Sequence, residues 1–156
     1  MKLASLLLMV TFLAGCTSQT VPSADTNHPD KNATVVINNQ KLSVGLADSD
    51  AEQIQGLSGT DSIPDDGLLF SFSEQGRWPI WMKDMRYPID IVWIADLKVV
   101  DVVHEAQPQP GVPDQQLTVY TPRAAADFVL EIASGRAKQL RLNPGTTLES
   151  LTLPQP

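Results

Sequence analysis

The sequence predicts a mainly β fold, a compact β-sandwich or small barrel with one or two short helices. Short apolar runs rich in β-branched residues follow one another closely from about residue 33 to 153. Asparagine, aspartate, glycine and proline separate most of these runs. Residues that clearly favour the start of a helix occur at one place only. The length of 156 residues fits one domain, which we expect over residues 33–156.

The first predicted elements are a hairpin and a short helix. Residues 34–38 and 41–46 are β-type runs, and the two residues between them predict a turn. Ser49 precedes Glu52 by three positions, which is the spacing of a capping box and predicts a helix start. Either of the next two glycines can end this helix.

The middle of the domain predicts a loop, a buried strand and a second hairpin. Residues 60–66 form the loop, and the apolar run 68–72 predicts the strand. Residues 90–95 and 99–104 predict the hairpin. Because the turn between them has no glycine, its type stays open.

The last third contains one ambiguous segment. Residues 107–116 hold three prolines and a glycine and predict a loop, and 117–121 predict a strand. Within 123–142 the alanines favour a helix, whereas apolar and polar residues alternate only weakly at 127–132. Residues 146–153 predict the final strand.

The N-terminus resembles the signal of a bacterial lipoprotein. A basic start and an apolar run too short to span a bilayer precede Leu13-Ala14-Gly15-Cys16. This tetrapeptide is similar to a lipobox, so we expect residues 1–15 to be a signal peptide and Cys16 to carry lipid, including palmitate. Cys16 is the only cysteine, which excludes an internal disulfide. Lipid at Cys16 would then make the membrane a partner of the protein.

Residues 16–32 are polar and lack an apolar period, which predicts a flexible tether after the lipidated cysteine. Thr17 follows the cysteine, where aspartate is similar to an inner-membrane retention signal. We therefore expect the outer membrane, facing the periplasm. Loss of Lys2 with the signal peptide changes the net charge from −7 to −8. Such an acidic chain is not expected to bind nucleic acid.

The sequence offers little chemistry for catalysis. The domain contains one histidine, His104, and no thiol, and no zinc-ligand spacing or nucleophile elbow occurs. We therefore assign no catalytic residue and expect neither a metal nor a cofactor.

Aromatic and basic residues gather between residues 77 and 94. All three tryptophans lie there, and we expect Trp93 in the core and Trp78 or Trp81 at the surface. An exposed tryptophan beside a cation can stack on a sugar or on a partner's side chain. The candidate ligand-binding residues of this segment are Trp78, Trp81, Lys83, Asp84, Arg86 and Asp90.

Two carboxylates stand in apolar runs. Asp90 is the only polar residue between Ile89 and Ile94, so we expect an ion pair with Lys83 or Arg86. The alternative is that Asp90 forms the polar floor of a pocket. Glu131, the second of these carboxylates, is the seventh candidate ligand-binding residue.

Three environments are open for Glu131. The solvent side of a strand is favoured, and pairing with Arg123 or Arg136 is the second. The third is a role with Asp90 as the acid and base of a hydrolase.

Five short blocks together resemble family 192 of the domains of unknown function. The resemblance covers about residues 34–153 and implies a jelly-roll-like β-sandwich. It favours a strand at 127–133 and a short helix from about residue 135, and it implies no activity. The sequence departs from the family with Gln55, Ser58 and Asp84 in place of arginine, methionine and asparagine. The blocks are Gly56-Leu57, Asp66–Phe72, Trp81–Asp84, Pro88–Ile91 and Val129–Gly135.

These observations predict a lipid-anchored envelope protein that is a non-catalytic binding module. The expected partner is an envelope glycan, a small ligand or another protein. The alternative is a hydrolase that acts on an envelope polymer through paired carboxylates.

Overall fold

The computed structural model describes residues 31–155. The predicted signal peptide, the lipidation site Cys16 and most of the predicted tether lie outside these residues. Among the residues that the structure describes, no helix is both long and apolar enough to cross a membrane.

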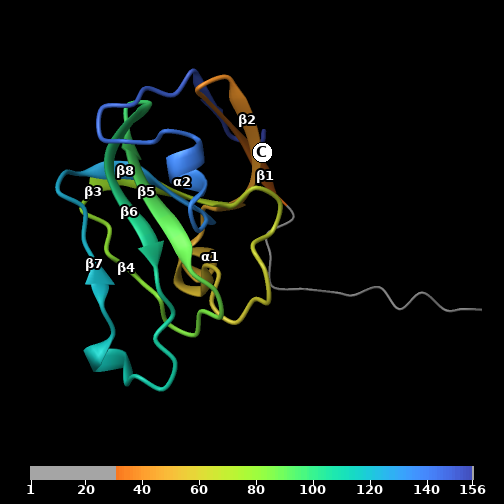
Figure 1. Cartoon of the computed structure of the whole chain (residues 1–156). Coiled ribbons are helices and arrows are strands. Elements are labelled where there is room, and N and C mark those ends of the chain that lie inside the picture. The colour runs from red at the N-terminus through yellow and green to blue at the C-terminus, as the bar shows by residue number, and fades with distance from the viewer. Residues whose placement is uncertain (1–30, 156) are drawn as a thin grey trace, which may run out of the picture.

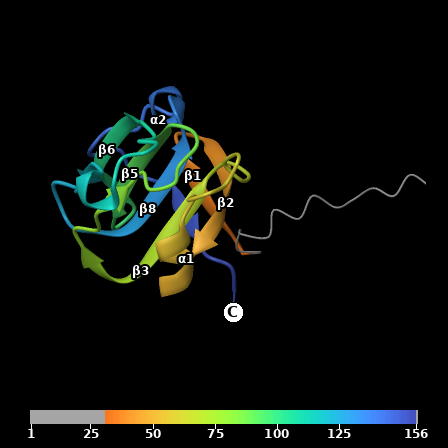
Figure 2. The same cartoon turned by 90° about the horizontal axis from the view of Figure 1, so that it is seen from below.

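One curled sheet of seven strands dominates the domain, and its strand order is β6-β5-β8-β3-β2-β1-β9 (Figures 1 and 2). Two short α-helices, α1 and α2, accompany the sheet, so the mainly β prediction is confirmed. Of the two forms expected, the curled sheet lies closer to a barrel. Its strands are β1 (Asn32–Ile37), β2 (Gln40–Ala47), β3 (Leu68–Gly76), β5 (Ile89–Ala95), β6 (Lys98–Ala106), β8 (Ala126–Ala133) and β9 (Ser150–Thr152).

Both predicted hairpins form around turns without glycine. Asn38 and Asn39 connect β1 to β2 with φ of 49° and 59°. Asp96 and Leu97 connect β5 to β6 with φ of 49° and 56°. Positive φ at both central residues is the signature of the type I′ turn, which asparagine and aspartate tolerate. The first turn lies one residue earlier than the sequence predicts.

The helix α1 (Asp50–Gln55) begins at the predicted capping box and ends at Gly56. The Ser49 hydroxyl accepts from the Glu52 amide, and the Glu52 carboxylate accepts from the Ser49 amide. β2 and β3 pair in parallel, which requires a crossover between them. α1 lies in this crossover.

Strands β5 and β8 pair inside the sheet, away from both edges, and have apolar clusters on both faces. One cluster includes Val92 and Leu130 together with residues of β1 and β2. The other includes Trp93 and Val129. All seven residues of β5 are buried, which confirms that this strand is covered on both sides.

The helix α2 (Arg136–Gln139) follows β8 directly, as the family resemblance implies for the ambiguous segment. α2 packs into the first cluster through Ala137 and lies in the hollow of the curled sheet, between the β1–β2 and β5–β6 hairpins (Figures 1 and 2).

A second, two-stranded sheet contains part of the strand expected at 117–121, but the sequence does not predict the sheet itself. It pairs β4 (Ile80–Trp81) with β7 (Val119–Tyr120), and a 3₁₀ helix, η1 (Asp114–Gln116), precedes β7. β4 follows Pro79 and contains only two residues, so its sequence carries no strand period. The pairing places Trp81 beside Val119, and it fixes the position of the Trp81 backbone.

Candidate functional site

The three tryptophans have different environments. Trp93 is fully buried, and its indole nitrogen donates to the carbonyl oxygen of Trp78 at 2.9 Å. Trp78 is half-buried and stacks on Phe72, with ring centroids 4.1 Å apart. Trp81 is 46% exposed. The segment 77–94 therefore supplies part of the core through Trp93 and part of the surface through Trp81.

Two of the three cations of this segment pair with carboxylates that are distant in sequence, and the third, Arg77, donates to the Pro122 carbonyl oxygen at 2.7 Å. Lys83 donates to Asp114 and Arg86 to Asp61, and both pairs are accessible to solvent. The hydrogen bond to Asp114 raises the pKa of Lys83 above its usual value. The Lys83 ammonium also lies 5.7 Å from the centroid of the Trp81 ring, within cation–π range.

The predicted ion pair of Asp90 with Lys83 or Arg86 is wrong. Asp90 is fully buried, and its two carboxylate oxygens each accept from a backbone amide at 2.8 Å. One amide belongs to Glu105, where the β5–β6 register shifts, and the other to Ala137 at the start of α2. Asp90 thus satisfies one buried and one partly buried donor, and its role is to join β5, β6 and α2.

Glu131 is neither on the solvent side of its strand nor paired with an arginine. Its side chain is 4% exposed and has no hydrogen bond or ion pair within residues 31–155. Arg123 donates to the Asp101 carboxylate instead, and Arg136 donates to the side-chain oxygen of Gln139. Burial raises the pKa of Glu131 to about 8, because a carboxylate without partners loses its hydration there. The group is therefore mostly a neutral acid at pH 7.

The two carboxyl groups point to opposite faces of the sheet. In the β5–β8 pairing, Asp90 is opposite Ile132 and Glu131 is opposite Ile91. Since successive side chains of a strand alternate between faces, neighbouring strands hold Asp90 and Glu131 on different sides. The sheet therefore separates the proposed acid–base pair, and the two groups do not share a cleft.

Trp81 borders an open groove with a volume of about 740 Å³, which we call the Trp81 groove. Lys83, Asp84 and Arg86 line it, so four of the seven candidate residues meet here. Ile54 also lines the groove and is 80% exposed, an unusual state for a large apolar side chain. The complete lining is Ile54, Gln55, Ser58, Gly59, Trp81, Lys83, Asp84, Met85, Arg86, Pro110 and Gly111.

A small cavity of about 70 Å³, which we call the Glu131 cavity, adjoins this groove. Ile54, Trp81 and Met85 line both spaces. Leu57, Phe70 and Ile80 make the wall of the cavity largely apolar, and Glu131 is its one acidic group. A fifth candidate residue therefore belongs to the same site. Trp78 and Asp90 line neither space.

Asp84 has a backbone role in this site. Its φ is 53°, in the left-handed region that asparagine and aspartate adopt more readily than most residues. Its carbonyl oxygen accepts from the Gly59 amide at 3.0 Å, which joins two parts of the groove wall. Since either residue suits this conformation, the exchange of the family's asparagine for Asp84 leaves the turn intact.

The sequence does not identify Ile54, Pro110 and Gly111 as parts of the groove. Ile54 is an apolar residue on the surface of a short helix whose described residues are not buried. That mismatch gives a weak signal. The sequence gives no signal for residues 110 and 111, because only tertiary folding brings the 107–113 loop next to α1.

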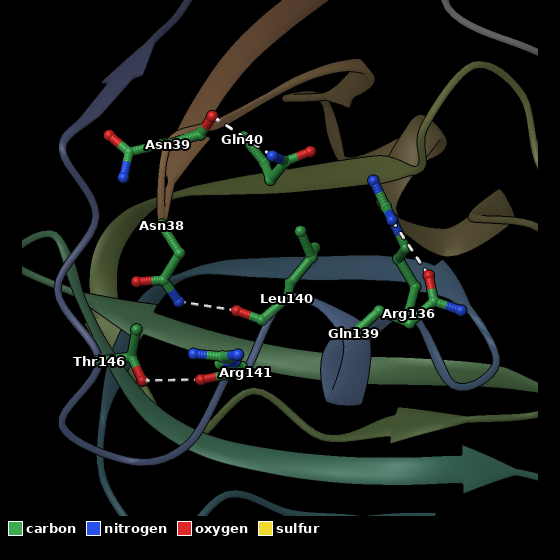
Figure 3. A pocket seen from close by; sticks show the side chains of 8 residues that line it. All are labelled: Asn38, Asn39, Gln40, Arg136, Gln139, Leu140, Arg141 and Thr146. Carbon is green, nitrogen blue, oxygen red and sulfur yellow. Dashed lines mark hydrogen bonds between the residues drawn. The ribbon is translucent and has the colours of Figure 1, made fainter.

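A second open pocket of about 600 Å³ lies at the turn between β1 and β2, against α2 (Figure 3). Its lining is polar, and the side chain of Asn38 donates to the Leu140 carbonyl oxygen at 2.7 Å. Arg136 and Arg141 give it cationic character. Neither an aromatic side chain nor any candidate residue lines it, and its lining residues are Asn38, Asn39, Gln40, Arg136, Gln139, Leu140, Arg141 and Thr146.

Comparisons with known proteins add a family and a fold. Residues 33–150 match the model of DUF192, described as an uncharacterized ACR. A candidate transcription regulator from Sinorhizobium meliloti 1021 has a similar crystal structure, with a TM-score of 0.65 and 28% identity over 78% of this chain and 94% of that one.

A protein of unknown function from Novosphingobium aromaticivorans DSM 12444 is also similar. Its TM-score is 0.63 and its identity 26%, over 76% of this chain and 84% of that one. No curated protein matches the sequence.

Proposed function

Because this chain belongs to the DUF192 family, whose description assigns no activity, we propose a function from the geometry of the Trp81 groove. The protein is a non-catalytic binding module of the cell envelope, which holds a glycan, a small ligand or a protein partner in that groove. The observation that carries this proposal is the exposure of Trp81 and Ile54 on the rim of one groove. Exposed large apolar side chains that border a hollow are typical of binding sites.

The hydrolase alternative has less support. A glycosidase holds its two carboxyl groups about 5–10 Å apart across one substrate. Asp90 and Glu131 lie on different faces of the sheet, and both oxygens of Asp90 are occupied by backbone amides. Asp90 therefore serves the fold, and binding remains the function that we propose.

Replacing Trp81 with alanine should lower affinity for soluble fragments of envelope glycan at least tenfold, because the indole supplies the exposed aromatic face of the groove. The melting temperature should change little, since the side chain is 46% exposed. Titration calorimetry and thermal unfolding of the full-length protein in detergent measure the two effects.

Leu97→Ala is the matched control. Leu97 is another exposed apolar residue, at 40%, and it lies in the β5–β6 turn outside the groove. This variant should bind as the original protein does. Equal affinities for Trp81→Ala and the original protein would contradict the proposed surface.

We also propose that Cys16 attaches the protein by lipid to the outer membrane, with the domain facing the periplasm. The support is Leu13-Ala14-Gly15-Cys16 after a short apolar run, and Thr17 in place of aspartate. Two or more acyl chains hold a protein stably, because each buried CH₂ contributes about 0.8 kcal/mol.

Changing Cys16 to serine should leave the signal peptide uncut and the protein without lipid. Mass spectrometry of the purified protein and separation of the two membranes by density test this. A Cys16→Ser protein that is still processed, lipidated and found in the outer membrane would contradict the assignment. Ser18→Ala, two residues away, controls for a change in this region and should be processed normally.

A further inference from the structure

The Glu131 cavity contains an unusual polar group. Its other polar side chains already donate to backbone carbonyl oxygens: Gln53 to Ser71, Gln55 to Ser58 and Ser58 to Lys83. Glu131 alone among the lining acids and amides has no partner within residues 31–155. A buried polar group without a partner is costly, so its presence at a cavity wall indicates a group that a ligand completes.

The protonation state of Glu131 defines what that ligand offers. A neutral carboxyl group donates one hydrogen bond through its O–H. Burial keeps this group protonated at neutral pH, since it raises the pKa of Glu131 to about 8. The matching ligand atom is therefore a neutral acceptor such as a carbonyl oxygen.

The size and lining of the cavity restrict further which chemical groups it can hold. About 70 Å³ is roughly twice the share of one water in the liquid, about 30 Å³, so the space takes only a few heavy atoms. Leu57, Phe70 and Ile80 supply an apolar wall that suits a methyl group. A methyl group joined to a carbonyl, the acetyl group, satisfies both the wall and the acid.

The groove at the mouth of the cavity suits a larger neutral body. Trp81 lines both spaces, and its ring is the exposed aromatic surface there. Aromatic side chains of this kind combine an apolar face with a polar edge and pack against partly apolar, hydroxyl-bearing surfaces. The C–H face of a sugar ring is such a surface, whereas an extended peptide presents no comparable flat face.

We propose that the site binds an N-acetylated amino sugar, with the ring against Trp81 and the acetamido group in the cavity, where its carbonyl oxygen accepts a hydrogen bond from Glu131. This inference rests on the proposed function and names the ligand class of the same groove. It implies that an acetyl group, rather than the sugar ring alone, determines affinity.

Within residues 31–155, no second titratable group lines the cavity. The neighbouring strands place apolar residues opposite Glu131, namely Ile91 on β5 and Leu68 on β3. Binding should therefore follow the ionisation of Glu131 alone. The charged residues on the elements around the cavity are Asp50 and Glu52 on α1, Glu74 on β3, Asp127 on the same face of β8, Lys83, Asp84 and Arg86 in the groove, and Asp90 on the other face of β5.

The test compares N-acetylglucosamine with glucose by NMR titration of the full-length protein in detergent. At pH 6.5 the acetylated sugar should bind about tenfold more tightly, the order of one desolvated hydrogen bond. At pH 9 this preference should fall about tenfold, because about one Glu131 group in ten remains protonated.

Three variants make the test specific. Glu131→Gln keeps an N–H donor, so it should retain the preference for the acetylated sugar at both pH values. Glu131→Leu has no donor and should lose that preference at both. Trp81→Ala should weaken the binding of both sugars.

Equal binding of the two sugars by the original protein would overturn the inference. If Trp81→Ala still abolished the capture of glycan fragments, the proposed function would stand without it. Tighter binding of glucosamine than of N-acetylglucosamine would overturn it in favour of an amine ligand that pairs with ionised Glu131. Equally tight binding of N-acetylalanine methylamide would overturn it in favour of a peptide.

Discussion

Replacing Asp90 with alanine should lower the free energy of unfolding by about 3–5 kcal/mol. The substitution leaves the partly buried amide of Glu105 and the buried amide of Ala137 without an acceptor, and each such loss costs about 1–3 kcal/mol. Because Ala137 begins α2, the loss should also loosen that helix against β5. Urea denaturation at pH 7, followed by circular dichroism, measures the change.

Two further variants test whether the lost acceptor oxygens cause this loss of stability. Asp90→Asn has nearly the same shape but keeps only one acceptor oxygen, so its cost should lie between those of the original protein and alanine. Asp84→Ala should cost about 1 kcal/mol or less, since Asp84 is exposed and only its left-handed conformation disfavours alanine. Similar small losses for Asp90→Ala and Asp84→Ala would show that the two amides do not depend on Asp90.

Replacing Glu131 with glutamine should stabilise the protein at pH 7 by roughly 3 kcal/mol. The pKa of Glu131 rises from 4.5 to about 8 on folding. Because the folded pKa is the higher one, ionisation opposes folding: the cost is absent below about pH 4.5, grows with pH and levels off above about 8. A pH of 7 lies about 2.5 units above the unfolded pKa of 4.5, and each of these pH units costs about 1.4 kcal/mol. Glutamine does not ionise and avoids this cost.

The pH profile separates this effect from a change in packing. Denaturant unfolding at pH 4, 7 and 9 should show that Glu131→Gln gains nothing at pH 4 and most at pH 9. Glu74→Gln alters an exposed carboxylate on β3 and should change stability little at any of these values. A gain from Glu131→Gln that is the same at all three pH values would contradict a neutral acid in the folded state.

Local chemistry explains the parts of the fold that the sequence predicts. The capping box joins Ser49 and Glu52, which are only three positions apart in the sequence. The type I′ turns likewise depend on single residues such as Asn38 and Asp96. The β4–β7 pairing depends on segments about 40 residues apart, and neither strand has a period of its own. Such pairings are decided by the tertiary fold.

In the candidate site too, the sequence predicts the features that depend on neighbouring residues and misses those that depend on the tertiary fold. The sequence identifies Trp81 and Lys83 because they lie two positions apart and remain together in the groove. It predicts the wrong partners for Asp90, because the nearest cations in sequence bind Asp114 and Asp61 instead. The environment of Glu131 depends on α1 and on β3, which no spacing around residue 131 reveals.

The strand β9 gives the domain a dependence on its last residues. β9 pairs Ser150, Leu151 and Thr152 with one edge of β1, and β2 pairs with the other edge. Among the described strands, β9 alone covers that first edge. An uncovered strand edge is a template for pairing between chains. A chain that stops before Ser150 would expose the backbone groups of β1 and tend to aggregate. β9 itself is short and is followed by Pro154, two features that restrain pairing at the new edge.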